Sequence, residues 1–148
     1  MAQTIVNGSN FNIWFTSGAT KKVLCSSTSC KVTLNQELRD VSTKDSGLWN
    51  EKLPGRLGWS ISADAMFFNS TLPTSSVSMS YIYDLMTTHS GVTVTFSITG
   101  SDYQTPALTA GYTYAGTVYI TSLDLSSSDK DNVTFSLSGD GTGALSRL

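Results

Sequence analysis

The segment LGWSISADAMF, residues 57–67, decides the fold class of this chain. Apolar side chains stand at every second position of the segment, and polar side chains or glycine fill most of the positions between them. A period of two places one set on a single face of a β-strand. Antiparallel sheets tolerate a polar second face and parallel sheets rarely do, so the segment predicts an antiparallel sheet. The apolar set is Leu57, Trp59, Ile61, Ala63, Ala65 and Phe67.

The same alternation recurs in GVTVTFSITG, residues 91–100, and in VTFSL, residues 133–137. The segment VSMSYIYDLMTTH, residues 77–89, instead repeats its apolar side chains at a spacing of three to four. It predicts a helix of about three turns, with cap candidates at residues 74–76. We therefore expect a mainly β protein, an antiparallel β-sandwich or partly closed barrel with one flanking α-helix, in a single domain over residues 1–148.

Glycines interrupt the strand pattern near the C-terminus. In YTYAGTVYITSLDLSS, residues 112–127, the alternation changes phase at Gly116, which predicts a bulge or a short turn there. In SGDGTGAL, residues 138–145, closely spaced glycines predict a bulge or a chain reversal. A phosphate-binding loop would need a helix after it, and too few residues remain to form one.

Charge and composition exclude several classes of partner. Serine and threonine make up 44 of the 148 residues, charged residues are 14%, and the net charge is −2. A protein that binds duplex nucleic acid needs a basic face, which this composition does not provide. No apolar run approaches the roughly 20 residues that span a bilayer, and the N-terminal residues show no secretion signal. We expect a chain that folds in a cytoplasm, has no membrane partner and keeps Cys25 and Cys30 reduced, although the spacing of the two cysteines leaves a disulfide open.

Catalytic chemistry is not indicated. The chain has a single histidine, His89, at the expected C-terminal end of the helix, where the helix dipole alone favours it. The segment DKDN, residues 129–132, lacks the spacing and the final glutamate of a calcium loop, and is typical of a polar turn. We therefore predict no catalytic residue, no cofactor and no metal.

Two blocks of sequence carry a resemblance to a known family. They are DVSTKDSGLWNEKLPGRLGWSISADAMF, residues 40–67, and YAGTVYITSLDLSSSDKDNVTFSLSGDGTGAL, residues 114–145. The first resembles the signature region of phage major tail tube proteins of the long, non-contractile type, the siphophage family. The second is similar to that family's closing pair of strands and its final glycine-rich segment. The cysteines and the high content of serine and threonine are not part of that pattern.

The resemblance implies a structural virion protein and not an enzyme. Such a subunit self-assembles into hexameric rings, and the rings stack into a tube that serves as the conduit for DNA ejection. The implied partners are other copies of the chain, a tape-measure protein, a tail terminator, and DNA that passes through the lumen without specific binding. The implied location is the virion tail, assembled in the bacterial host cytoplasm.

Residues 40–57 hold six of the chain's charged residues, which number nine basic and eleven acidic, and show no regular period. Within the tail tube interpretation we predict that they form a long inter-subunit loop. Trp49 and Leu53 would be its apolar anchors, because aromatic and aliphatic side chains dominate interface energetics. The predicted contact residues are Asp40, Lys44, Asp45, Trp49, Glu51, Lys52, Leu53 and Arg56.

Two alternatives remain open from the sequence. The first is a tube, terminator or baseplate protein of a contractile injection system, since related folds serve there. The second is a small β-sandwich that binds carbohydrate, with Trp14, Trp49 and Trp59 as a stacking platform. Trp59 falls on the apolar side of its expected strand, which argues against that platform. The sequence does not identify the residues that would line a lumen, because both faces of most strands carry hydroxyl groups.

Overall fold

The computed structural model describes residues 11–17, 20–24, 27–67, 76–97 and 113–147. Cys25 lies outside these residues, so its pairing with Cys30 stays untested. The described part contains eight strands and one helix. In chain order they are β1 (Asn12–Ser17), β2 (Thr20–Leu24), β3 (Ser27–Asp40), β4 (Lys52–Met66), β5 (Ser76–Val77), α1 (Met79–Thr87), β6 (Val92–Ser97), β7 (Thr113–Ser126) and β8 (Thr134–Arg147).

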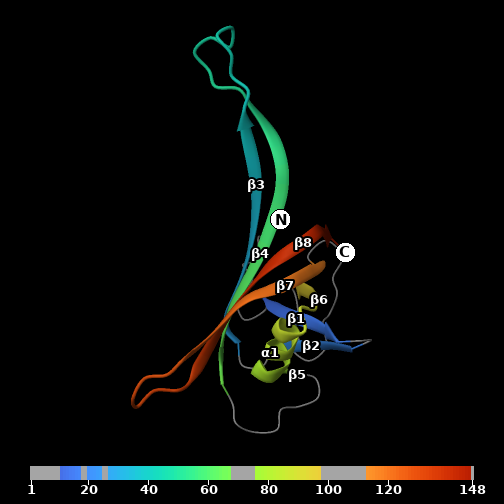
Figure 1. The fold of residues 1–148 in the computed structure, drawn as a ribbon, viewed down its shortest axis with the longest axis vertical. Coiled ribbons are helices and arrows are strands. Elements are labelled where there is room, and N and C mark those ends of the chain that lie inside the picture. The colour runs from blue at the N-terminus through green and yellow to red at the C-terminus, as the bar shows by residue number, and fades with distance from the viewer. Residues whose placement is uncertain (1–10, 18–19, 25–26, 68–75, 98–112, 148) are drawn as a thin grey trace, which may run out of the picture.

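All eight strands belong to one sheet, in the order β3-β4-β8-β7-β6-β1-β2-β5 (Figure 1). Every neighbouring pair is antiparallel except β2 and β5, which are parallel over two residues. The prediction of a mainly β, antiparallel protein with a single helix is therefore confirmed for the described chain.

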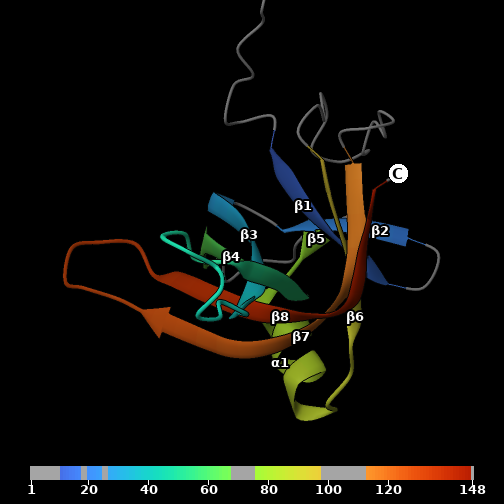
Figure 2. The same cartoon turned by 90° about the horizontal axis from the view of Figure 1, so that it is seen from above.

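The sheet curls over a single core, so that β1 and β2 cross β4 and β8 at a steep angle (Figure 2). Four of the six alternating apolar residues of segment 57–67 are buried in this core. The first and the last are not: Leu57 is 67% exposed and Phe67 is 40% exposed. The body of the domain therefore covers only the middle of that apolar face. Other core residues are Ile13, Phe15, Leu24, Val77, Ile82, Val92, Val94, Phe96, Val118, Phe135 and Leu137.

Helix α1 is shorter than the sequence predicts. Ser78 caps it, with its hydroxyl accepting a hydrogen bond from the Tyr81 amide at 3.4 Å, whereas residues 76–77 extend along β2 as strand β5. The predicted cap at residues 74–76 was therefore wrong, because pairing with β2 takes up the residues just before the helix. Ile82 is the helix's buried residue. Within the described chain no helix has the length and apolarity needed to cross a membrane.

Glycine positions on β7 and β8 have separate roles. The pairing of these strands shifts register between Ala115–Ser146 and Thr117–Thr142, so that Gly116 alone lies opposite residues 143–145. The extra residues are on β8, which confirms a bulge in the glycine-rich segment, whereas β7 keeps its register with β6 through Gly116, so the bulge predicted there was wrong. The glycine-rich segment 138–145 does not reverse the chain but lies inside β8. A Cβ atom on Gly116 or Gly141 would overlap the indole of Trp59, so these glycines make room for that ring.

Candidate assembly surface

Strands β3 and β4 continue far beyond the rest of the sheet. Strand β4 pairs with β8 only from Met66–Thr134 to Ser60–Asp140, whereas the β3–β4 ladder runs on to Asp40 and Lys52. Residues 34–58, here called the arm, therefore project from the body as a two-stranded ribbon (Figure 1). Isolated two-stranded hairpins are at best marginally stable in water.

The predicted loop of residues 40–57 needs a correction. Asp40 ends β3 and residues 52–57 begin β4, so only residues 41–51 connect the two strands. The sequence obscured this because the ladder shifts register between Gln36 and Leu38, which breaks the alternation, and because Pro54 and Gly55 stand in the strand. Proline is tolerated in a strand that lies at an edge, and beyond the body β4 has β3 as its single ladder partner in the described structure.

Apolar side chains of the arm are uncovered. The described residues include twelve exposed large hydrophobic side chains, and seven of them lie on the arm. Leu48 is fully exposed and Trp49 is 83% exposed, both in the connection at the tip. Large apolar side chains that are exposed in such number on one segment favour an interaction site there. The seven are Leu34, Leu38, Val41, Leu48, Trp49, Leu53 and Leu57.

Hydrogen bonds organise the polar groups at the tip. The hydroxyl and the backbone amide of Ser42 hydrogen-bond the Asp40 carboxylate and, together with the nearby Lys52 charge, hold the pKa of Asp40 below its ordinary value. The Glu51 amide donates to the Ser42 hydroxyl at 2.8 Å. The tip is thus a folded turn that presents its side chains outward.

All eight predicted contact residues therefore lie on the arm and are exposed. Whether they touch another subunit stays a prediction. Leu34, Leu38 and Leu57 were not predicted as contact residues. Apolar residues that alternate along a strand are normally expected to face the core, and nothing in the sequence indicates that the arm lacks a covering layer.

A platform of three tryptophans is absent from the described structure. Trp14 and Trp59 are buried, and the Trp59 indole nitrogen donates to the Gly143 carbonyl oxygen at 3.3 Å. Trp49 is exposed alone, at the far end of the arm. These positions rule out the sugar-stacking surface considered from the sequence.

The sheet face opposite the core is polar across β3, β4 and β8. At its centre the Asp64 carboxylate accepts hydrogen bonds from the hydroxyls of Ser136 at 2.6 Å and Ser29 at 2.8 Å. These two bonds lower the pKa of Asp64, with the Ser136 bond the larger cause. No three His, Cys, Asp or Glu side chains gather anywhere in the described residues in a way that could hold a metal ion.

Besides the two-residue strand β5, which ends the strand order on one side, two longer sheet edges of the body have no partner strand among the described residues. Strand β3 stands at one end of the strand order, and its outer edge has no partner strand among the described residues. Strand β7 pairs with β6 only over Thr113–Val118, which leaves residues 119–126 open on that side. Open edges present unpaired backbone groups that readily pair with another chain.

The comparisons with known proteins give one family match and several structures of similar fold. The family described as phage tail tube protein matches residues 6–147. Two solved structures come from gene transfer agent particles: the tail of an empty particle with C6 symmetry (21% identity, TM-score 0.78) and a native virion (19%, 0.71), each with 99% of both chains covered. The SPP1 tail tube is 13% identical over 97% of this chain and 80% of that one, with a TM-score of 0.72.

A fourth fold likeness is to the baseplate of the anti-feeding prophage (AFP), with 12% identity, a TM-score of 0.65, and 100% of this chain and 97% of that chain covered. No curated protein matches the sequence. The structural likenesses, all below 25% identity, establish the fold, whereas the family match covers nearly the whole sequence. This chain belongs to the phage tail tube protein family.

Proposed function

We propose that this chain is the major tail tube subunit of a long-tailed phage or a related particle, and that it self-assembles into stacked hexameric rings that form the conduit for DNA ejection. The observation that carries the proposal is the arm. A two-stranded ribbon with seven exposed large apolar side chains has little stability in an isolated protein. It would be stabilised if neighbouring subunits covered these side chains.

The two open edges support closure into a ring. Strand β3 and residues 119–126 of β7 bound opposite sides of the sheet segment β3-β4-β8-β7. When the β3 edge of one copy pairs with the β7 edge of the next, each contact is heterologous, and a rotation that closes the ring leaves neither of these two edges free. Six copies would then form one continuous barrel, in keeping with the C6 symmetry of the similar gene transfer agent tail.

The polar face of the sheet fits the wall of such a conduit. It carries Asp64 and its serine partners, and its nearest cation in the strand register is Lys31, which pairs with Ser62. A wall that neutralised many phosphates would hold the DNA in place, because every neutralised phosphate adds to its binding. A hydroxyl-rich, weakly acidic wall lets DNA pass without specific binding.

The remaining partners follow from the same proposal. A tape-measure protein would occupy the lumen before DNA enters, and a terminator would close the end of the tube. The protein would act in the virion tail after assembly in the bacterial host cytoplasm, as a structural component with no catalytic role and no cofactor.

Electron microscopy of the purified protein tests the proposal. We expect rings or tubes with sixfold symmetry at micromolar concentration or after addition of tail initiator proteins. Trp49→Ala should raise the critical concentration about thirtyfold, the effect of removing about 2 kcal/mol from an interface anchor, whereas Tyr83→Ala on the exposed side of α1 should leave it unchanged. A protein that stays monomeric under all these conditions would refute the proposal.

A second candidate is a tube or baseplate protein of a contractile injection system. The fold likeness to the AFP baseplate favours it. Gene neighbourhood separates the two candidates. A sheath gene beside this one would support the contractile system, and a tape-measure gene shortly downstream without a sheath gene would support the non-contractile tube.

A further inference from the structure

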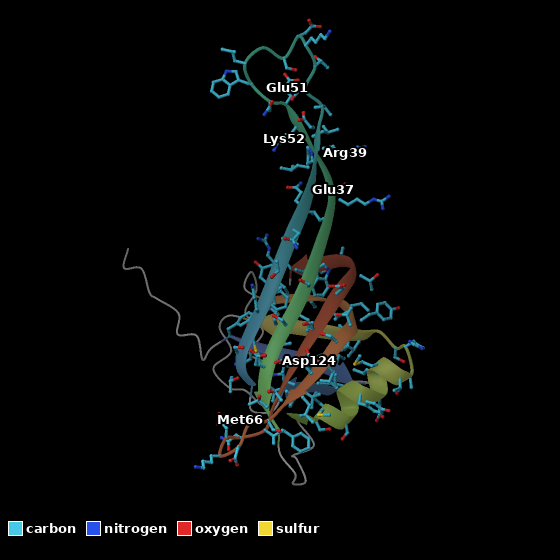
Figure 3. The ribbon with its side chains drawn as sticks, turned by 60° about the vertical axis from the view of Figure 1, so that its left-hand side comes forward. Glu37, Arg39, Glu51, Lys52, Met66 and Asp124 are labelled. Carbon is cyan, nitrogen blue, oxygen red and sulfur yellow. The ribbon has the colours of Figure 1, made fainter. Side chains whose placement is uncertain are left out.

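The exposed apolar side chains of this protein gather at two opposite ends. Seven of the twelve lie on the arm, and three lie at the far end of the body: Met66 and Phe67 follow the last buried residue of β4, and Leu125 is level with the last buried residues of β4 and β8. Figure 3 places Met66 at that end, Asp124 on the body above it, and Glu51 and Lys52 near the arm tip. We call the three residues the base rim; they are Met66, Phe67 and Leu125.

Two residues of the base rim, Phe67 and Leu125, continue the core-facing side of the sheet, as Leu57 of the arm does at the other end, whereas Met66 lies on the opposite face. Leu125 pairs with Phe135, and Phe135 pairs with Ala65, so Leu125 stands in the core-facing row but lies outside the core. Phe67 follows the end of β4 and is the next core-facing position after Ala65. Its amide donates to the Val133 carbonyl oxygen at 2.9 Å, which holds Phe67 at the rim. At the other end the same face continues through Leu57. The apolar face therefore extends past the body in both directions.

We propose that the arm tip, with Leu48 and Trp49, docks on the base rim of a second copy of this chain in the next ring. The inference rests on the proposed function and adds to it the surface that receives the arm. Both partners are apolar, exposed and at opposite ends of the molecule, so their contact moves one copy along the long axis. Each copy then still offers a free tip and a free rim, which is the condition for an open stack.

The dimensions of the arm agree with a contact outside the subunit's own ring. The paired part that extends past Gln36 adds four residues of β3, or about 13 Å at about 3.3 Å per residue, and the connection of residues 41–51 lies beyond that. The tip lies far from the body of its own subunit, so it can contact a neighbour along the axis more readily than its own core.

A groove on the body is the competing receptor. It has a volume of about 520 Å³. It lies between β3 on one side and residues of β6, β7 and β8 on the other, where a lateral neighbour could fill it. The groove lies beside the arm root and not at the opposite end, so a tip bound there would not produce an axial repeat. Its lining residues are Phe11, Cys30, Lys31, Val32, Leu34, Phe96, Tyr114 and Leu145.

Disulfide trapping tests the inference. In a chain with Cys25→Ser and Cys30→Ser, the pair Trp49→Cys and Leu125→Cys should cross-link on oxidation of assembled protein and give a ladder of multimers on a denaturing gel. Mixed single variants should give dimers only. Trp49→Cys with Tyr83→Cys is the matched control and should not cross-link, and Trp49→Cys with Leu145→Cys reports the groove.

The outcomes separate this inference from the proposed function. Tubes with a 49–125 ladder support both. Three outcomes overturn the docking site but not the tube function. They are tubes without that ladder, a 49–145 product, and a double variant that stops at dimers. If wild-type protein forms neither rings nor tubes, both fall together.

A charge substitution decides the case if the cysteine variants do not assemble. Leu125→Asp in the otherwise unchanged chain should raise the critical concentration for tubes at least tenfold, and Tyr83→Asp should change it less than twofold. Circular dichroism of both monomers should match the wild type. Normal tubes from a folded Leu125→Asp protein would overturn the inference.

Discussion

Trp59 explains glycines that the strand pattern alone could not explain. Its indole lies over Gly116 of β7 and Gly141 of β8, and a Cβ atom at either position would overlap the ring. The indole nitrogen also donates to the carbonyl oxygen of Gly143. One large side chain on β4 thus requires small residues on two other strands, which the sequence shows only as irregular glycine spacing.

Gly141→Ala should destabilise the monomer by about 1–3 kcal/mol, because the added methyl group forces the indole or the strand to move. For a chain of this length, that corresponds to a fall in melting temperature of about 2–4 °C per kcal/mol. Urea denaturation of the monomer gives the free energy of unfolding. The control is Gly58→Ala, where an added Cβ meets no atom within 4 Å, and it should change stability by less than about 0.5 kcal/mol. Equal stability of the two variants would contradict this packing role of Gly141.

Asp64 links three strands through its carboxylate, and Ser136 is the larger cause of its lowered pKa. Because the folded-state pKa lies below the ordinary value of 3.8, the ionised carboxylate stabilises the fold above that value. This contribution is lost as the pH falls through the lowered folded-state pKa. Ser136→Ala should therefore raise the pKa of Asp64, as measured by NMR titration of the carboxyl carbon, and reduce the acid-dependent loss of stability. Ser138→Ala, on the next residue of the same face, should leave the Asp64 titration unchanged.

At the scale of the element, the arm differs from the other strands in what covers it. Strand β4 changes character along its length: residues 60–65 have a partner strand on both sides, and residues 52–58 have β3 alone. Packing and flanking hydrogen bonds stabilise the first part, whereas the second part depends on a single ladder. Such segments belong to the low-stability end of a protein's local unfolding range.

Hydrogen exchange should show this difference directly. Amides of residues 35–40 and 52–58 should exchange within about tenfold of the unfolded rate in the monomer, and at least a hundredfold more slowly in assembled tubes, where neighbouring subunits cover them. The core amides of residues 61–65 are the internal control and should be protected in both states. Strong protection of the arm in the monomer would mean that the ribbon is stable without partners.

The sequence predicted the elements whose side chains meet a covering layer. Alternation located the middle of β4, β6 and β8, because each of these strands buries one face in the core. Alternation did not predict that Leu57 and Phe67 are exposed. It also did not identify the strand over residues 52–57, because a register shift and Pro54 interrupt the pattern there. Those positions depend on partners outside the chain or on a register that spacing does not encode. The contact residues were predicted on the correct segment but as a loop, for the same reason.

For the whole molecule, the buried core and some of the exposed apolar side chains, among them Leu57, Phe67 and Leu125, belong to one face of the sheet. The core occupies the waist, and the same face runs out along the arm and to the base rim. In the proposed assembly, other copies would cover those ends, and further copies would pair with the open edges of β3 and β7 at the sides. Axial and lateral contacts would then lie on different parts of the surface, so that substitutions could separate them.

Shortening the arm should remove axial contacts and spare lateral ones. Gln36 and Leu57 face each other in the ladder, so replacing residues 37–56 by Asn-Gly joins them through a two-residue type I′ turn. The deleted segment contains no buried residue, so the melting temperature should change by less than about 3 °C. Electron microscopy should show single rings and no tubes, because the edges of the body remain. Full-length protein with Leu48→Ser and Trp49→Ser tests whether the anchors, and not the arm's length, hold the stack. Tubes built from the shortened chain would show that axial stacking resides in the body instead.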